Sequence, residues 1–230
     1  MPRIFLVRHG KADAQGAVYD KLTEIGHKQA ELFARYIQAA GVRVDAIYSG
    51  SMERQKDTAS YLAKLTGIEV SVTPRLNEFL PGFWRATADE IAASDPGFKK
   101  DLERYLAIRT RGDFRSLALF LRQTERIMRE WRGGLTAPGA ESFTEFRARV
   151  HSILDEVRTA SGSVFLFSSG TPLSLMIAGL LGMEEERFFD WMRILYNTSL
   201  SVFNTERGRF LPVTVNTLPH LPDRRLHTLL

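Results

Sequence analysis

The chain has 230 residues, 44% hydrophobic and 25% charged, a balance typical of a soluble globular protein with one core. It contains no cysteine, which excludes disulfides, thiolate metal sites and a cysteine nucleophile. The net charge is +4, and residues 99–132 carry ten basic and five acidic side chains, so +5 lies there and −1 elsewhere. Such an excess of positive charge attracts anions. Because no nucleic-acid-binding motif accompanies it, we interpret these basic residues as a solvent-exposed helix surface.

The first third of the chain alternates between strand and helix patterns. Strands are expected at residues 3–7, 44–49 and 68–72, and helices at 23–41 and 52–65. The last of these strands alternates apolar and polar residues, which predicts a half-buried position near an edge of the sheet. The β-α-β-α-β order predicts an α/β fold with three α/β/α layers and a mostly parallel central sheet.

The pattern then changes to helix. Residues 79–138 hold no convincing strand, and we expect them to form a helical cap inserted into a single domain of residues 1–230. The later elements are expected to be a helix at 143–158, a central strand at 164–167, a helix at 172–182, an amphipathic segment at 186–195 and a hairpin at 199–215. Thr171 and Pro172 are predicted as the N-cap and the first residue of the helix they precede.

No segment has the pattern of a targeting or membrane sequence. The N-terminal apolar run meets Arg8 too soon for a signal peptide, and the longest apolar stretch, residues 173–183, falls short of the roughly 20 residues that span a bilayer. We therefore expect a cytoplasmic protein without a membrane partner.

Four polar segments fall at predicted strand ends, where open parallel sheets bind ligands. These segments are Arg8-His9-Gly10, Ser49 to Arg54, Leu76-Asn77-Glu78 and Ser168-Ser169-Gly170-Thr171. Guanidinium groups such as Arg8 and Arg54 match phosphate oxygens, while a neutral imidazole such as His9 can attack phosphorus. A carboxylic acid at Glu78 can protonate a leaving oxygen. The four segments together predict a single anion site.

Other motifs are missing from the sequence. No dinucleotide-binding, Walker or serine-hydrolase motif occurs, and Ser169 lacks the elbow spacing of a serine nucleophile. No histidine and carboxylate cluster has metal-ligand spacing, so we expect metal-free chemistry without a cofactor. His27 is expected on a helix surface and His220 as an anchor of the C-terminal segment.

In this order, the segments resemble the histidine phosphatase superfamily, which includes cofactor-dependent phosphoglycerate mutase. The resemblance covers nearly the whole chain. Its motifs are Phe5 to Gly10, Leu22 to Ala30, Ile47 to Arg54 with Thr58-Ala59, Glu78 with Gly82-Phe83-Trp84, and Gly139 to Ser142 with Arg149-Val150.

The resemblance implies that His9 forms a phosphohistidine, that Arg8 and Arg54 hold phosphate oxygens, and that Glu78 protonates the leaving alcohol. The chain departs from the family at Ser169, where the family has a second histidine. A serine hydroxyl still donates one hydrogen bond but carries no charge. The function implied is a metal-independent phosphomonoester hydrolase whose turnover is slowed because Ser169 replaces a histidine. It would act on a small phosphorylated substrate and bind no nucleic acid.

Two alternative functions remain compatible with the sequence. One is a non-catalytic phosphate-binding or regulatory protein of the same fold, and the other is a phosphoglycerate-type mutase. The sequence does not predict the oligomeric state. Replacement of Ser169 by histidine is expected to raise turnover.

Overall fold

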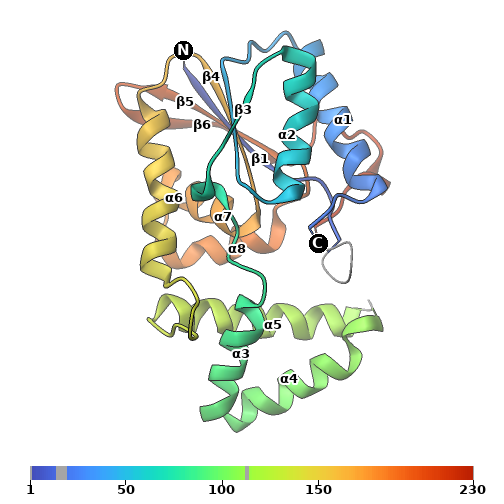
Figure 1. Cartoon of the computed structure of the whole chain (residues 1–230), viewed down its shortest axis with the longest axis vertical. Coiled ribbons are helices and arrows are strands. Elements are labelled where there is room, and N and C mark those ends of the chain that lie inside the picture. The colour runs from blue at the N-terminus through green and yellow to red at the C-terminus, as the bar shows by residue number, and fades with distance from the viewer. Residues whose placement is uncertain (1, 14–19, 112–113, 230) are drawn as a thin grey trace. The chain divides into compact units, whose positions relative to one another are not determined.

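The computed structural model describes residues 2–13, 20–111 and 114–229, and within them the strands form one mixed sheet (Figure 1). The strands are β1 (Arg3–Arg8), β2 (Ala46–Ser49), β3 (Val70–Val72), β4 (Ser163–Ser168), β5 (Leu200–Glu206) and β6 (Arg209–Thr217), in the spatial order β3-β2-β4-β1-β5-β6. Strands β3, β2, β4 and β1 run parallel to one another, whereas β5 is antiparallel to both β1 and β6. The predictions of a mostly parallel sheet, an edge position for β3 and a final hairpin are confirmed.

The helices of the described ranges follow the predicted order. They are α1 (Glu24–Ala39), α2 (Glu53–Thr66), α3 (Phe83–Ser94), α4 (Pro96–Ile108), α5 (Phe114–Arg132), α6 (Phe143–Arg158), α7 (Gly170–Leu180) and α8 (Phe188–Ile194). None of them is both long and apolar enough to cross a membrane. Helices α1 and α2 lie on one side of the sheet, and α6 lies on the other (Figure 1).

Aromatic side chains form much of the core between the sheet and α1. Phe5 on β1 stacks on Phe165 of the adjacent β4 with 4.2 Å between ring centroids, and Phe33 of α1 meets Phe167 edge-on at 5.8 Å. Successive side chains of a strand point to opposite faces, so Leu6 is buried on the other side of the sheet. Both faces of β1 and β4 are therefore covered, and only the ends of these strands can offer polar groups to a ligand.

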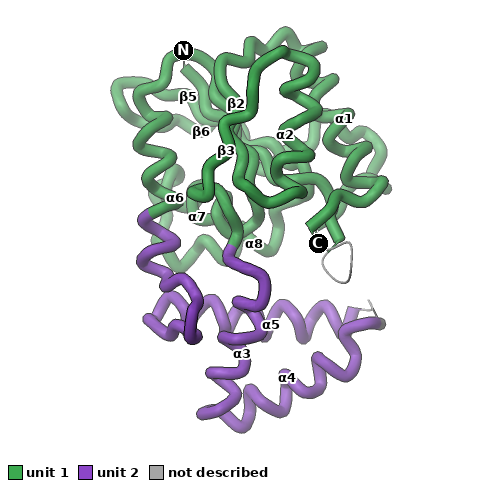
Figure 2. The backbone as a smooth tube through the Cα atoms, in the orientation of Figure 1, with its two compact units in different colours: residues 1–78, 149–230 green, residues 79–148 purple. Residues whose placement is uncertain are grey.

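The chain divides into two compact units (Figure 2). Unit 1 comprises residues 1–78 and 149–230 and contains the whole sheet, while unit 2 comprises residues 79–148 and contains α3, α4 and α5. Unit 2 has its own core, in which Trp131 is fully buried and donates its indole N–H to the Glu141 carbonyl over 2.9 Å. The described residues of the segment that the sequence assigns to a helical insertion form helices and turns.

The basic residues of unit 2 are extensively ion-paired. Arg126 contacts the Glu130 carboxylate at 2.7 Å and the Asp95 carboxylate at 3.3 Å, and Arg122 pairs with Asp101. Exposed pairs of this kind contribute little stability, and pairing leaves the +5 excess of residues 99–132 in place. The exposed pairs fit the solvated helical face that the sequence favours.

The predicted beginning of α7 is wrong. Thr171 is not the N-cap: the helix begins at Gly170, and the carbonyl of Ser169 accepts the Leu173 N–H at 3.2 Å. The Thr171 N–H donates instead to the Glu78 carboxylate over 3.0 Å. A side chain distant in sequence therefore satisfies the first turn, and local capping statistics cannot reveal such a partner.

His220 is buried and anchors the segment after β6, as the sequence predicts. Its Nε2 lies 3.0 Å from the Thr198 hydroxyl, whose own proton goes to the Asn197 carbonyl over 2.8 Å. His220 Nε2 is therefore the donor, and its buried Nδ1 has no partner among the described residues. Burial, together with the nearby His227, lowers the pKa of His220 to about 4.

We expect this histidine to make the protein less stable in acid. The unfolded chain binds a proton as the pH falls below about 6.5, whereas the folded chain binds it only near the lowered pKa, so stability is complete above pH 6.5 and is lost as the pH falls towards 4. Urea unfolding at about pH 7.5 and about pH 4.5 should show the His220→Gln variant losing less stability than the wild type, by roughly 2–3 kcal/mol. Equal losses in the two proteins would refute this account.

Candidate active site

His9 lies directly after β1, buried at the carboxyl edge of the sheet. Its Nδ1 lies 2.7 Å from the Gly10 carbonyl, which can only accept, so Nδ1 carries the proton and Nε2 keeps its lone pair. The Arg54 Nε–H donates to that lone pair over 3.1 Å. Burial first, then the nearby Arg54 and Arg8, lowers the pKa of His9 well below its usual value. The imidazole is therefore neutral, with a nucleophilic nitrogen aimed at a cation.

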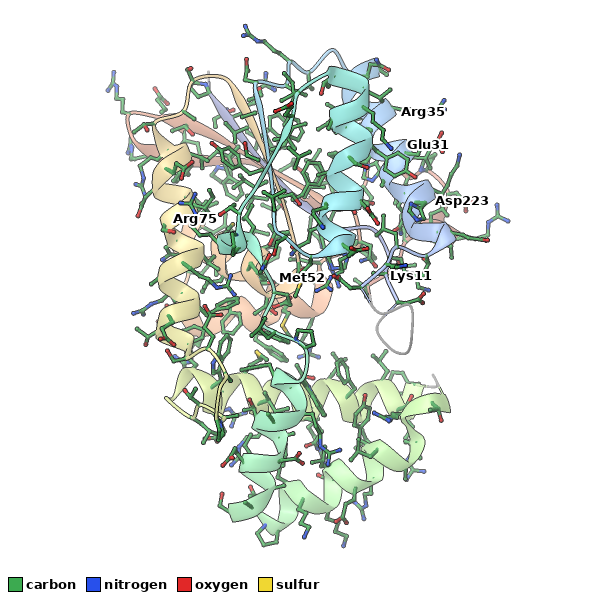
Figure 3. The ribbon with its side chains drawn as sticks, in the orientation of Figure 1. Lys11, Glu31, Arg35, Met52, Arg75 and Asp223 are labelled. Atoms are coloured by element: carbon green, nitrogen blue, oxygen red, sulfur yellow. The ribbon has the colours of Figure 1, made fainter. Side chains whose placement is uncertain are left out.

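Two close backbone approaches hold the His9 loop in place. A Cβ added to Gly10 would lie 2.5 Å from the Gly26 carbonyl oxygen, and one added to Gly26 would lie 2.0 Å from the Lys11 carbonyl oxygen. The chain leaving β1 therefore passes against the start of α1, where only glycine leaves enough room. Figure 3 labels Lys11 in this loop and Met52 just before α2.

Thr58 connects α2 to the same loop. Its hydroxyl donates to the Arg54 carbonyl over 2.7 Å and accepts the Gly10 N–H at 3.0 Å. This one side chain fixes the second turn of α2 relative to the residue that follows His9. Arg54 and His9, which are 45 positions apart in sequence, are thus held at contact distance.

Arg54 is also held by a carboxylate that the sequence does not reveal. Its Nη1 donates to Asp20 Oδ1 over 2.5 Å, and Asp20 Oδ2 accepts the Glu53 N–H at 2.8 Å. The Asp20 and Arg54 side chains are 17% and 10% exposed, so the pair is largely shielded from water. A planar guanidinium fixed at both Nη1 and Nε has little rotational freedom, which orients its remaining N–H groups.

Arg8 reaches the site from the last residue of β1. Its Nη1 donates to the main-chain carbonyls of Leu195 and Leu229, each over 2.5 Å, while its buried Nε has no partner among the described residues. Burial lowers the pKa of Arg8 to about 10, so the group stays charged at neutral pH. A buried, unsatisfied cationic donor is the kind of group that an anion would satisfy.

Glu78 is placed by a network at the end of the β3 connection. The Arg149 guanidinium donates to the carbonyls of Arg75 and Asn77, over 3.1 and 2.8 Å, and the Asn77 amide oxygen accepts the Ser51 N–H at 2.7 Å. Glu78 itself accepts from the first turn of α7 and raises the pKa of Arg8 through its charge. Its carboxylate therefore lies within electrostatic range of the Arg8 guanidinium.

Ser169 completes the cluster and is almost fully buried. Its hydroxyl oxygen lies 3.4 Å from Arg54 Nη2 and 2.8 Å from the amide nitrogen of Gln55. Direct contacts thus join His9, Arg54 and Ser169, and Arg8 and Glu78 act on this cluster or on each other through their charges. Sequence reasoning missed Asp20 and Gln55, because nothing in their local pattern distinguishes them from surface polar residues.

Among the described residues, no group of three or more histidine, aspartate or glutamate side chains is arranged to hold a metal ion. The donors of the site are instead cationic or neutral N–H and O–H groups. Such a donor set suits an oxyanion rather than a cation.

The protein is thus an α/β protein in which a neutral histidine and two buried arginines lie at the carboxyl edge of a mixed sheet. The sequence profile of the histidine phosphatase superfamily (branch 1) matches residues 4–129 and 112–218. The chain belongs to the histidine phosphatase superfamily.

The chain is similar in sequence to a protein named as a probable mutase, and its fold is similar to solved structures that include a phosphatase. "Probable phosphoglycerate mutase GpmB" of Yersinia pestis is 27% identical over 192 residues, which cover 80% of this chain and 76% of that protein. The Entamoeba histolytica phosphoserine phosphatase in complex with 3-phosphoglyceric acid superposes with a TM-score of 0.63 at 23% identity, covering 96% of this chain and all of that one. Bacillus stearothermophilus YhfR gives a TM-score of 0.68 at 20% identity over 96% and 99%. At these identities the solved structures establish the fold.

Proposed function

We propose that this protein is a phosphomonoester hydrolase in which His9 is the covalent nucleophile. The observation that carries the proposal is the contact between His9 Nε2 and Arg54 Nε at 3.1 Å, in a histidine whose Nδ1 proton is held by Gly10. A neutral imidazole with its lone pair beside a guanidinium is poised to attack a phosphorus atom whose oxygens that guanidinium holds.

In the first step, the phosphoryl group takes the place of the imidazole as acceptor of the Arg54 Nε–H. The His9 Nε2 lone pair forms a bond to phosphorus, and the bond from phosphorus to the ester oxygen breaks. Arg8 and Arg54 stabilise the charge on the phosphoryl oxygens. Glu78 acts in its protonated form and gives that proton to the leaving oxygen, so an alcohol departs and a phosphohistidine remains.

In the second step, water attacks the phosphohistidine. The Glu78 carboxylate accepts a proton from the water as its oxygen bonds to phosphorus, and the bond from phosphorus to His9 Nε2 breaks. Inorganic phosphate leaves, and the imidazole returns to its neutral form. The protons balance because Glu78 regains the one that it gave to the alcohol.

Ser169 occupies the position at which the family resemblance places a second histidine, and we infer that its hydroxyl serves as a neutral donor to the phosphoryl group. One preorganised donor is worth about 10²–10³ in rate, and an uncharged donor supplies less than a cation. We therefore propose a slower enzyme than one with a histidine at this position.

The substrate that we propose is a small phosphorylated compound. An open pocket of about 650 Å³ is lined by Tyr196, Arg224, His227 and Leu229. The Leu229 carbonyl accepts from Arg8, so the pocket adjoins one residue of the proposed site, although His9, Arg54 and Ser169 do not line it. A volume of this size accommodates a metabolite-sized ligand.

Acid–alkali chemistry and phosphate release together test the proposal. The purified chain is incubated with p-nitrophenyl phosphate and a panel of small phosphomonoesters, and free phosphate is measured. In parallel, ³²P-labelled substrate is used to detect a covalent adduct that is stable to alkali and labile to acid. Release together with this adduct is expected. Phosphate binding without release would favour a non-catalytic binding protein, and transfer to a second hydroxyl without release would favour a mutase.

The role of Glu78 predicts a dependence on the leaving group. Glu78→Gln should lower the rate on an alkyl phosphate by about 10²–10⁴-fold, because an alkoxide needs a proton to leave. The loss on p-nitrophenyl phosphate should be much smaller, because nitrophenolate leaves without a proton. Steady-state rates on the two substrates check this, and equal losses on both would contradict the proton-donor role.

A further inference from the structure

Gln55 is a fully buried glutamine on α2, next to Arg54, and its amide orientation is set by groups that can act in only one way. Its oxygen accepts the Met52 N–H at 3.3 Å, and its nitrogen donates to the Leu76 carbonyl over 3.1 Å. A main-chain N–H only donates and a carbonyl only accepts, so the amide cannot be reversed. The group that faces Ser169 is therefore the NH₂.

This orientation determines how the Ser169 hydroxyl is arranged. The Ser169 oxygen must accept from the Gln55 amide nitrogen at 2.8 Å, and it also lies 3.4 Å from Arg54 Nη2, which can only donate. A hydroxyl has two lone pairs and one proton. Because the two accepted hydrogen bonds use both lone pairs, only the O–H proton is still available for a hydrogen bond. Among the described residues, no acceptor takes that proton. It is left to face whatever binds beside Arg54.

The local backbone is built around this amide. A Cβ added to Gly50 would lie 1.9 Å from the Gln55 amide oxygen, so only glycine at that position leaves the side chain in place. The Leu76 carbonyl that accepts from Gln55 also accepts the Ser168 hydroxyl at 2.6 Å. The residues that follow β2 and β4 and the segment before Glu78 thus lie around one amide.

We propose that Gln55 is a positioning residue that turns the Ser169 hydroxyl into a donor to the bound oxyanion. Without the amide, the Ser169 hydroxyl loses the donor that fixes one of its lone pairs, so the hydroxyl can rotate and turn a lone pair towards the anion. The proposal deepens the proposed function, because it assumes that an oxyanion occupies this site, but it does not require turnover.

The test is a double-mutant cycle that uses orthovanadate as a probe of the phosphoryl site. Vanadate affinity is measured by calorimetry for the wild type, Gln55→Met, Ser169→Ala and the double variant. Each single change should weaken binding about tenfold, the effect of one hydrogen bond to a charged group. The double variant should bind no more weakly than Ser169→Ala, because Gln55 then has no hydroxyl to orient.

Gln29→Met is the matched control. Gln29 is also fully buried, and its amide bonds the Lys11 N–H, the Leu226 carbonyl and the Thr228 hydroxyl without touching Ser169. Its effect on vanadate affinity should be the same with serine or alanine at position 169. If Gln55→Met fails to fold, Gln55→Glu is used in its place. The added negative charge is present with both serine and alanine at position 169, so its effect cancels when the two vanadate affinities are compared.

A Gln55 effect that is unchanged in the Ser169→Ala background would overturn the positioning role and reduce Gln55 to a structural residue. A wild type that binds no vanadate would overturn it as well. Vanadate coupling without phosphate release would uphold the role of Gln55 while rejecting the hydrolase. Release without coupling would do the reverse.

Discussion

His9→Ala is expected to reduce phosphate release to the uncatalysed background while leaving the chain folded. In the proposed mechanism the imidazole supplies the electron pair that bonds to phosphorus, and none of the neighbouring Arg8, Arg54 and Ser169 can replace it as a neutral nitrogen nucleophile. Removing the nucleophile of a well-studied hydrolase lowers kcat by on the order of 10⁶-fold. From a slower starting rate, the measurable fall should be on the order of 10³-fold or more. Release of p-nitrophenol and loss of the alkali-stable ³²P adduct check it.

His27→Ala is the matched control for that experiment. His27 is exposed on α1, where its Nδ1 lies 3.1 Å from the Tyr61 hydroxyl. Its removal should leave the rate within a factor of about two, because an exposed hydrogen bond outside the site contributes little. Full turnover by His9→Ala would end the nucleophile assignment. Equal losses in both variants would point to a general effect of losing histidine.

Ser169→His combined with Gln55→Ala is expected to raise the rate by up to about 10²-fold, which is less than the worth of a whole preorganised donor because the Ser169 hydroxyl already supplies a neutral one. The sequence alone suggests the single change, but the structure argues that it is insufficient. Ser169 is 1% exposed and its hydroxyl is in contact with Gln55. An imidazole adds as many heavy atoms as Gln55→Ala removes, so the pair of changes approximately conserves the buried volume.

The single variant is the informative comparison. Ser169→His with Gln55 in place should be overpacked, with lower thermal stability and no gain in rate, because inserting atoms into a filled interior forces side chains out of their preferred rotamers. Gln55→Ala alone should be slower than the wild type. Phosphate release and urea midpoints of the four proteins check both statements. A full gain from the single change would show that the site has more room than the burial of Ser169 indicates.

The sheet and its helices were predictable because their signals are local. Apolar runs, alternation and the 3.6-residue period follow from how a strand or helix meets a core, and the handedness of β-α-β connections then sets a parallel sheet. The placement of Arg8, His9 and Arg54 at one sheet edge also follows, since parallel strands end on the same side. The beginning of α7 was not predictable, because the partner of the Thr171 N–H is Glu78, which lies 93 positions away in the sequence.

The finer organisation of the site depended on contacts that no local pattern contains. Gln55 meets Ser169 across 114 positions of sequence, and the Leu229 carbonyl meets Arg8 across 221. In the sequence, Asp20 looks like any polar loop residue, and only the folded structure shows that it pairs with Arg54 of α2. These contacts decide which N–H groups are occupied and which remain for a ligand.

Residue patterns alone were enough to predict the α/β fold, the family and the meeting of Arg8, His9 and Arg54 at one edge of the sheet. Three features of the site required the folded structure: His9 is a neutral acceptor, Asp20 restrains Arg54, and Gln55 faces Ser169 with its donor side. They could not be predicted because burial and hydrogen-bond direction are properties of a packed neighbourhood. A residue's type limits what it can donate or accept, but its distant partners determine what it does.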